Sequence, residues 1–526
     1  MKIDLPHAPF FVRPPVDDNG GVDFLGLRQA NLNLMDTFLP GVNNVTWNVR
    51  PYSMMAWTVW AFANEARERG MTEIKASDFT KFREKVEVLF NWGHQLDDNG
   101  AGMPGNAQVP PAGAGEVPLD FASWKRNVTW FDAVNYGPSI KDENGLGFVH
   151  QVESGLFRPT EAGEALAKAL DETLRATQEY ETLESLETGR ATEAVAQRLY
   201  GAWRIDECSA REATIFKDVL YQADASDESA RVQRRSGAIS LIQESLSEIG
   251  RPLRADEIRA EMMRTTTQSR RSLPVARAKA VWTVLQIRQA QRLAFEALFA
   301  WMEMRILVQG DASSQQLVGA LVALLTAQGY DLGRQDWVSA CLATSMQGAT
   351  IEGSIVDIGL NDDGVGILAQ TNELANDIPD HRDDSAVRAV MLLFLVAAVT
   401  EELEKAEEYA ELLNEGGSQR VSLRWWSRFV KGKGGLPAPQ FLTNAFENYL
   451  LSQHFGIAAI RTSESKPRLR ITIEEEGLVS LLKKDADIWQ PGVTADRLES
   501  TLSLMADCGL LNRMWDDGEE QWRYSP

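Results

Sequence analysis

Cysteine and histidine are scarce in this chain, which limits its metal and redox chemistry. The 526 residues include only three cysteines (Cys208, Cys341 and Cys508) and five scattered histidines. No two of them have a short spacing such as CxxC or HExxH, which would place two ligands on one side of a metal ion. The cysteines also lie too far apart in sequence for a small disulfide scaffold. We therefore expect a reducing compartment, no metal and no cofactor.

Basic residues are fewer than acidic residues in this chain. The chain has 53 Lys and Arg against 75 Asp and Glu, which gives a formal net charge of -22. A protein this acidic is repelled, averaged over its surface, by nucleic acid and by anionic membranes. Any contact with nucleic acid must therefore come from locally basic segments.

Long apolar runs are missing as well. The longest, residues 389–399 and 317–325, reach about half of the roughly 20 residues that cross a bilayer. The first residues, MKIDLPHAPFFVRPP, do not follow the basic-then-apolar order of a signal peptide. We expect a soluble, cytoplasmic protein without a membrane partner.

The signature motifs of common enzymes are also absent. The sequence contains no GxxxxGK[ST] phosphate loop, no GxSxG nucleophile turn and no glycine-rich dinucleotide loop. We name no catalytic residue and expect a protein that is not an enzyme. A metal-dependent nuclease stays open as an alternative, with Asp357, Asp362 and Asp363 as its candidate carboxylates.

What the sequence does contain is mostly helical pattern. The fold class expected is mainly α: a multi-domain helical protein with winged-helix-like modules, built on short β-hairpins, near residues 120–170 and at the C-terminus. Shifts in composition suggest consecutive segments. These are a helical domain (1–99), a Gly/Pro linker (100–118), a winged-helix-like segment with an acidic helix (119–200), a central helical domain (201–415) and a C-terminal winged-helix region (418–526).

The first winged-helix-like segment shows local start and turn signals. We expect a helix over residues 130–136, a strand over 146–152, a turn at Glu153-Ser154-Gly155 and a return strand over 156–158. Thr160 is the expected N-cap of the helix that follows.

Two basic segments stand out against the acidic background. Residues 231–292 carry thirteen basic and five acidic side chains, and residues 418–484 carry eleven and five. The first includes two helices around a Gly-Arg-Pro turn, typical of either a helix-turn-helix or a plain helical pair. A long helix over 275–308 should follow, with its basic first half able to reach solvent. The candidate nucleic-acid-binding residues in these segments are Arg264, Arg270, Arg271, Arg277, Arg424, Arg428, Lys431, Lys433, Arg468 and Arg470.

The basic segments have a second interpretation. They can be solvated faces that pair with acidic helices of the same chain, such as the run EELEKAEEYAELL at residues 401–413. We expect that run to be a helix that leaves the core for solvent or for a partner.

The last 33 residues carry the clearest module. Thr494 is expected to cap a helix, residues 510–515 to form a strand, Asp516-Asp517-Gly518 a turn, and residues 521–524 the return strand. This order resembles a winged helix, a family whose members either insert a helix into the major groove or dock on proteins. The resemblance implies Arg497 and Arg513 as DNA contacts, together with Arg523. The carboxylates at the tip of the wing favour protein docking instead.

Two wider resemblances concern function. The strings LPGVNNVT, RPYSMMAW, YGPS, LGFV and TEAGEALA resemble uncharacterised proteins of bacterial defence islands. The acidic, helical chain with winged-helix-like modules near both ends resembles kleisin-type scaffold subunits of chromosome-structuring complexes. The first implies a DNA-contacting or scaffold subunit in anti-phage or anti-plasmid defence. The second implies a scaffold that docks on a motor ATPase and does not read DNA by itself.

Overall fold

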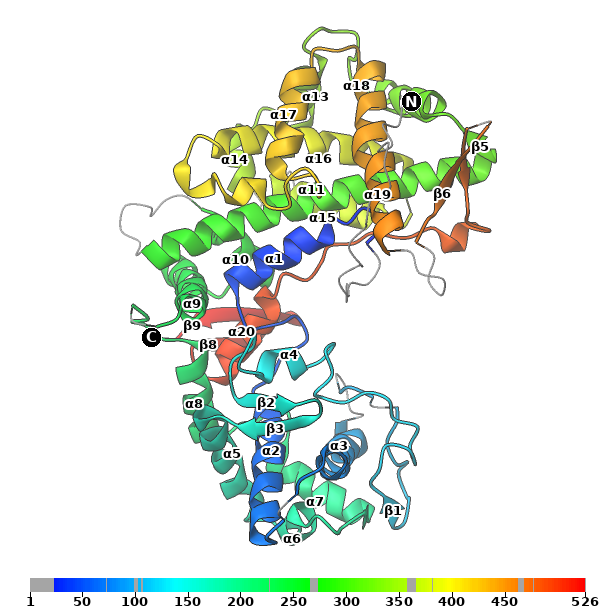
Figure 1. Ribbon diagram of the computed structural model, residues 1–526. Helices are drawn as coiled ribbons and strands as arrows, with labels where there is room; N and C mark the ends of the chain where they lie inside the picture. Colours follow the sequence, from blue (N-terminus) through cyan, green and yellow to red (C-terminus); the bar gives the residue numbers. More distant parts are fainter. Residues whose placement is uncertain are drawn as a thin grey trace. The chain divides into compact units, whose positions relative to one another are not determined.

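The computed structural model confirms a mainly α protein with short β-hairpins (Figure 1). It is 59% helical, and its sheets are small and antiparallel. The residues that it describes are 23–71, 73–98, 103–105, 107–226, 228–264, 273–356, 366–380, 382–461, 468–475 and 477–525. Within this part of the chain, no helix has both the length and the apolar composition to cross a membrane.

The chain folds into two compact units, and neither is a continuous stretch of sequence. Unit 1 consists of Met1–Leu34 and Ala280–Thr494, and unit 2 of Met35–Lys279 and Ala495–Pro526. The sequence suggested consecutive segments, whereas each unit combines residues from both halves of the chain. The division falls inside two helices, α1 (Arg28–Phe38) and α11 (Leu273–Gln309).

Unit 2 is built around a helical core that is rich in aromatic side chains. Its first part packs α2 against α5 and α3 against α7, and Trp57, Trp92, Trp130 and Trp203 are almost fully buried. The elements of this part are α2 (Arg50–Glu68), α3 (Ala76–Asp98), β1 (Val117–Pro118), α4 (Gly137–Ile140), β2 (Val149–Glu153), β3 (Leu156–Pro159), α5 (Glu161–Leu174), α6 (Tyr180–Glu184), β4 (Arg190–Ala191), α7 (Glu193–Trp203) and α8 (Ala210–Leu220).

The hairpin near residue 150 forms as expected. β2 pairs with β3 in antiparallel register, and Thr160 caps α5, its hydroxyl accepting a hydrogen bond from the Gly163 N–H at 3.1 Å. The helix expected over residues 130–136 is wrong, because that stretch forms turns before the short α4. Its Trp130 indole instead donates to Asn91 at 3.0 Å, so tertiary contacts fix an irregular backbone there.

The C-terminal module of unit 2 is assembled from two stretches that are more than two hundred residues apart in sequence. The first supplies α9 (Ala230–Ile249), an isolated bridge residue, Leu253, and α10 (Ala255–Glu261); the second supplies α20 (Leu498–Asp507), β8 (Leu511–Asp516) and β9 (Glu519–Tyr524). Leu253 pairs antiparallel with Trp522, their N–H groups donating to each other's carbonyl oxygens at 2.9 and 2.8 Å.

The resulting order is helix, bridge strand, helix, helix, strand, strand, which is the order of a winged helix. Both the helical pair around the Gly-Arg-Pro turn and the C-terminal hairpin form as predicted, but they belong to one module. The expected Thr494 cap is wrong, since α20 begins at Leu498 after Arg497, which has φ +69° and gives no side-chain cap.

Unit 1 is organised around α11, which is buried on all sides along most of its length and carries polar as well as apolar side chains into the interior. Its 37 residues correspond to a helix of about 55 Å. Around it lie β5 (Asp311–Ala312), α12 (Ser314–Ala327), α13 (Trp337–Ser345), α14 (Ile351–Val356), α15 (Ile367–Asp377), α16 (Arg382–Leu403), α17 (Leu423–Lys433), α18 (Ala438–Ala445), a π-helix (Phe446–Leu451), α19 (Ser452–Arg461), β6 (Ile471–Glu474) and β7 (Gly477–Ser480), with 3-10 turns at Glu407–Tyr409, Leu412–Asn414 and Asp485–Asp487.

Two expectations about unit 1 are wrong. Apart from its first residues, where Arg277 is exposed, the basic half of α11 does not reach solvent, because Arg288 and Arg292 are buried and bonded within the unit. The acidic run at residues 401–413 is not a projecting helix: α16 ends at Leu403, and 3-10 turns follow whose Tyr409 and Leu413 are buried. Buried apolar residues at those two positions hold the run against the core.

Candidate interaction surfaces

The helix that would read DNA in a winged helix, α20, is covered by the chain itself. Of its ten residues only Glu499 is exposed. The Ser500 hydroxyl donates to the Asn43 carbonyl at 2.9 Å and the Ser503 hydroxyl to the Trp47 carbonyl at 2.6 Å. Residues 43–49 therefore occupy the surface that a DNA groove would need.

A buried carboxylate closes the C-terminal end of α20. The backbone N–H of Val49 donates to Asp507 at 3.1 Å, and Cys208 Sγ lies 3.4 Å from the Asp507 carbonyl oxygen. Burial raises the pKa of Asp507 to about 6 and that of the Cys208 thiol to about 12. These contacts make the C-terminal end of α20 part of the interior of unit 2.

Two of the three arginines that the winged-helix resemblance singled out, Arg497 and Arg513, are engaged inside unit 2, whereas the third, Arg523, is exposed on the wing. Arg497 pairs with Asp36 at 2.6 Å and donates to the Leu39 carbonyl at 3.3 Å, and its side chain is 10% exposed. Arg513 donates to Ser503 and pairs with Asp507 at 3.4 Å. Their positive charges are directed at the protein's own carboxylates.

The helical pair of the same module is also internally paired. Arg259 of α10 binds Asp496 at 2.7 Å, and Arg254 binds Glu519 of β9 at 3.1 Å. Arg264 pairs with Glu261 at 3.1 Å. Of the other candidates in this basic segment, Arg277 is exposed near the start of α11, and Arg270 and Arg271 lie outside the described residues.

Part of the second basic segment forms the outer face of α17, and acidic residues at the end of α16 and just after it pair with its cations. Arg424 and Arg428 both reach Glu404, at 2.8 and 3.5 Å, and Lys431 pairs with Glu401 at 2.5 Å. Lys433 is exposed beyond them. This is the pairing between basic and acidic segments of one chain that the sequence left open as an alternative.

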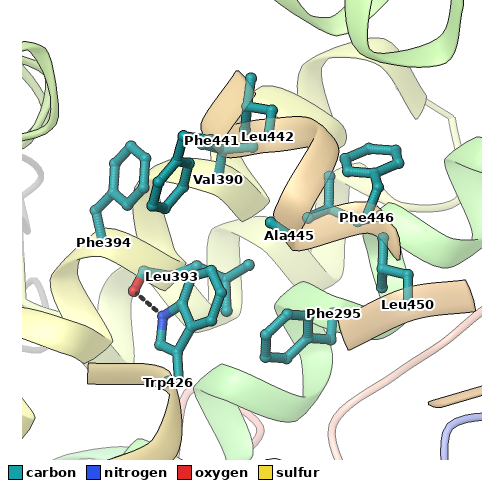
Figure 2. A pocket seen from close by; sticks show the side chains of 11 residues that line it. Phe295, Val390, Leu393, Phe394, Trp426, Phe441, Leu442, Ala445, Phe446 and Leu450 are labelled. Atoms are coloured by element: carbon teal, nitrogen blue, oxygen red, sulfur yellow. Dashed lines mark hydrogen bonds between the residues drawn. The ribbon is translucent and has the colours of Figure 1, made fainter. Parts of the chain in front are cut away.

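Trp425 is the unusual residue of that face. It is 48% exposed and lies one helical turn before Arg428, whose side chain is 68% exposed. Its neighbour Trp426 is buried, and the Trp426 indole donates to the Leu393 carbonyl at 2.7 Å (Figure 2). Local spacing alone did not show which of the two tryptophans faces solvent.

Arg470 makes its side-chain contacts inside unit 1. Its guanidinium pairs with buried Glu303, with one N–O distance of 3.0 Å, and lies 4.3 Å from the centre of the Phe24 ring. Nearby His454 accepts from the Arg470 N–H at 3.1 Å, and burial lowers its pKa to about 4. Arg468, two residues earlier, is half-buried.

Two hollows are found among the described residues of unit 1. One is an apolar cavity of about 20 Å³ beside the π-helix, lined by side chains such as Phe295, Trp426 and Phe441 (Figure 2). It has room for about one water molecule and offers no polar lining, so it is a packing defect. The other is a groove of about 310 Å³ among α13, α16 and α17, with Phe394 in its lining and the Glu401–Lys431 pair at its edge. The sequence did not indicate this groove, because its walls come from three separate helices.

Metal binding receives no support from the arranged side chains. Within the described ranges, no group of three His, Cys, Asp or Glu residues is placed to hold a metal ion. The candidate nuclease carboxylates Asp357, Asp362 and Asp363 lie outside those ranges.

Comparison with known proteins adds no relative. No family model, no curated protein and no solved structure matches this chain. The resemblances to defence-island proteins and to kleisin-type scaffolds therefore stay predictions.

Proposed function

We propose that this chain is a non-enzymatic scaffold subunit of a bacterial multi-protein complex. The burial of α20 carries this proposal. A helix-turn-helix protein reads DNA by placing the second helix of the pair in the major groove, with side chains on its exposed face touching bases. The exposed surface of α20 is reduced to Glu499, a carboxylate that phosphates repel. A winged helix in this state is suited to docking on proteins.

The distribution of charge supports the same function. Arg254 and Arg259 of the C-terminal module and Arg424 and Lys431 of α17 face carboxylates of their own unit, which offsets part of the basic charge of the two segments. The chain as a whole has a formal net charge of -22, which attracts basic protein partners more readily than nucleic acid.

The cellular setting is the finer part of the proposal. The resemblance of the N-terminal third to defence-island proteins supports a cytoplasmic complex that acts against phages or plasmids. The kleisin-like form of the proposal adds a motor ATPase as the partner, with the present chain as the connecting subunit.

The test is whether the chain belongs to a larger assembly in an extract of its own organism. A tagged full-length chain should elute well above 58.5 kDa, in fixed ratio with the products of neighbouring genes. The purified chain should not shift a 30-base-pair duplex at low salt, where electrostatic binding is strongest. A lone monomer in the extract would overturn the scaffold function, and tight duplex binding by that monomer would favour direct contact with DNA.

Direct contact with nucleic acid is the second candidate, and the exposed face of α17 favours it. Trp425 offers a ring on which a base can stack, and Arg428, Lys431 and Lys433 offer cations for phosphates. Such a surface prefers single strands, because a stacked base must leave its duplex.

Charge variants separate the two candidates. If α17 binds a single strand, Glu401→Gln/Glu404→Gln should tighten binding of a labelled oligonucleotide several-fold, because the paired cations are released. Arg428→Ala/Lys433→Ala should weaken it and reduce its salt dependence. If the fluorescence anisotropy of the oligonucleotide does not change when the parent chain or either double variant is added, direct contact with nucleic acid is excluded.

A further inference from the structure

We infer that the wing of the C-terminal module, the β8–β9 hairpin, docks a basic segment of a partner protein that carries arginine or lysine beside apolar side chains. The inference rests on the proposed scaffold function and names the class of partner that it requires. The wing belongs to unit 2, and Figure 1 labels its strands β8 and β9 near the C-terminus.

The wing exposes large apolar side chains that the fold itself does not use. Trp515 is 67% exposed and Met514 is 43% exposed, although both lie in a strand. Neighbouring residues of a strand point to opposite faces, so the hairpin presents one apolar side chain on each face. Tryptophan is among the residues that contribute most to binding energy at protein interfaces.

The face that carries Trp515 begins in the core and ends in solvent. Leu511, Arg513 and Trp515 share this face, and the residue opposite Arg513 is Trp522, which is 3% exposed. Directly across from Trp515 is Glu520. The core anchors the base of the hairpin and leaves the ring of Trp515 at its free end.

The charges around Trp515 are negative. Asp516 and Asp517 are exposed at the turn, and Glu520 lies across the hairpin from the ring. The nearest arginines bind other groups among the described residues. Arg513 binds Ser503 and Asp507, and Arg254 binds Glu519. Arg523 lies on the other face of the hairpin, opposite Asn512.

An aromatic ring among carboxylates selects a cationic ligand. A guanidinium or ammonium group can lie over the tryptophan face, which attracts cations, while the neighbouring carboxylates accept its hydrogen bonds. The same carboxylates repel a phosphate backbone. Charge complementarity therefore identifies the occupant as a basic protein segment.

A second exposed aromatic residue extends the surface. The Ser503 hydroxyl donates to the Trp47 carbonyl, and Arg513 of the wing donates to Ser503, so Trp47 and the wing approach the same residue of α20. Trp47 is 39% exposed and Val45 43% exposed. A segment that lies along the wing toward α20 would meet Trp515 first and Trp47 next.

The test uses the full chain and a labelled peptide of alternating arginine and leucine as the probe. Trp515→Ala and Asp516→Asn/Asp517→Asn should each weaken peptide binding about tenfold or more. Two matched controls should bind as the parent does: Trp425→Ala removes an exposed tryptophan of unit 1, and Glu407→Gln/Glu408→Gln removes the same charge elsewhere. Thermal unfolding of all variants should match that of the parent, because the changed side chains are exposed.

Three results would overturn the inference. The first is peptide binding that is equal in the wing variants and the controls. The second is duplex binding that is lost with Trp515→Ala, which would make the wing a nucleic-acid surface. The third is self-association of the chain that Trp515→Ala abolishes, which would assign the surface to a second copy.

The elution size of the chain and of Trp515→Ala in the native extract distinguishes failure of this inference from failure of the scaffold function. If the chain elutes in a large assembly and Trp515→Ala leaves that assembly unchanged, the wing inference fails and the scaffold stands. If the parent chain elutes alone, the scaffold function fails first.

Discussion

Buried arginines in this protein hold irregular backbone segments in place. Arg235 of α9 donates to the carbonyls of Leu220, Val219 and Pro40 at 2.9, 2.7 and 3.1 Å. Arg288 of α11 donates to the carbonyls of Arg420 and Val421, and Val421 has φ +46°, which a β-branched residue rarely adopts. A guanidinium has five donors in a fixed plane, so it can satisfy several carbonyls at once, both in loops and at the end of a helix such as α8.

One buried carboxyl on α11 predicts a pH dependence. Glu296 has no exposed surface, and burial raises its pKa to about 8, although Arg292 donates to it at 2.9 Å; Asp23 adds repulsion and Arg28 some attraction. The folded chain therefore keeps a proton that the unfolded chain loses above pH about 4.5. The free energy of unfolding should fall as the pH rises from 4.5 to 8, by up to about 1.4 kcal/mol per pH unit.

Glu296→Gln should remove this contribution, because the amide cannot ionise. Melting temperatures measured from pH 5 to pH 8 should fall more for the parent than for the variant. Glu402→Gln, which changes an exposed carboxylate of α16, should follow the parent. Parallel curves for Glu296→Gln and the parent would contradict the burial argument.

The thiols of unit 2 should be unreactive in the folded protein. Burial raises the pKa of both Cys208 and Cys508 to about 12, and carboxylates, Asp507 among them, add to the effect. Because the thiolate is the nucleophile, alkylation by iodoacetamide at pH 8 should be at least about a thousandfold slower than for free cysteine. Mass spectrometry of the native and the denatured chain measures this, and rapid native labelling of either thiol would contradict it.

At the scale of elements, local sequence signals predicted the positions of helices and hairpins well. They did not predict which of the surfaces of these elements are buried. The residues of α20 form a helix because they combine an apolar face with Gly509 as the stop, and β8–β9 turns at Asp517-Gly518, both with positive φ. Whether α20 reads DNA depends on residues 43–49, which cover it. Similarly, the cations of α17 were visible in the sequence, but their pairing with α16 was only one of two alternatives.

A capping variant tests the hairpin module of residues 149–174. Thr160→Ala should lower the free energy of unfolding of unit 2 by about 1 kcal/mol or more, since the Gly163 N–H loses its acceptor and the Gly147 carbonyl loses a donor at 2.6 Å. Thr160→Ser keeps the hydroxyl and should recover most of the loss. Denaturant unfolding followed by tryptophan fluorescence measures both, and equal stability of Thr160→Ala and the parent would exclude the cap.

At the scale of the whole molecule, the interrupted module predicts how a truncation would act. Removing Ala495–Pro526 takes α20 and the wing from unit 2, together with the strand that pairs with Leu253. Hydrogen exchange should therefore rise in α9, α10 and residues 43–49, which are distant in sequence from the deletion. The core helices α11 and α16 of unit 1 should keep their protection.

A point variant serves as the matched control for this truncation. Trp522→Ala leaves the chain complete but empties the buried site beneath the hairpin, so it should raise exchange in α9 and α10 to a lesser degree. An increase that is uniform over both units, or confined to the new terminus, would contradict the interrupted module.

The sequence by itself determined the helical class, the two hairpins, the Thr160 cap and the long α11, because periodicity, caps and turns are properties of neighbouring residues. It also identified the acidic tip of the wing. Only the tertiary structure decided that one module with the element order of a winged helix is shared by residues 230–261 and 498–524, that α20 is covered, and that Arg288, Arg292 and Arg470 are internal. Burial and ion pairing depend on contacts between residues up to several hundred positions apart, such as Asn43 and Ser500, and no local pattern encodes such a contact.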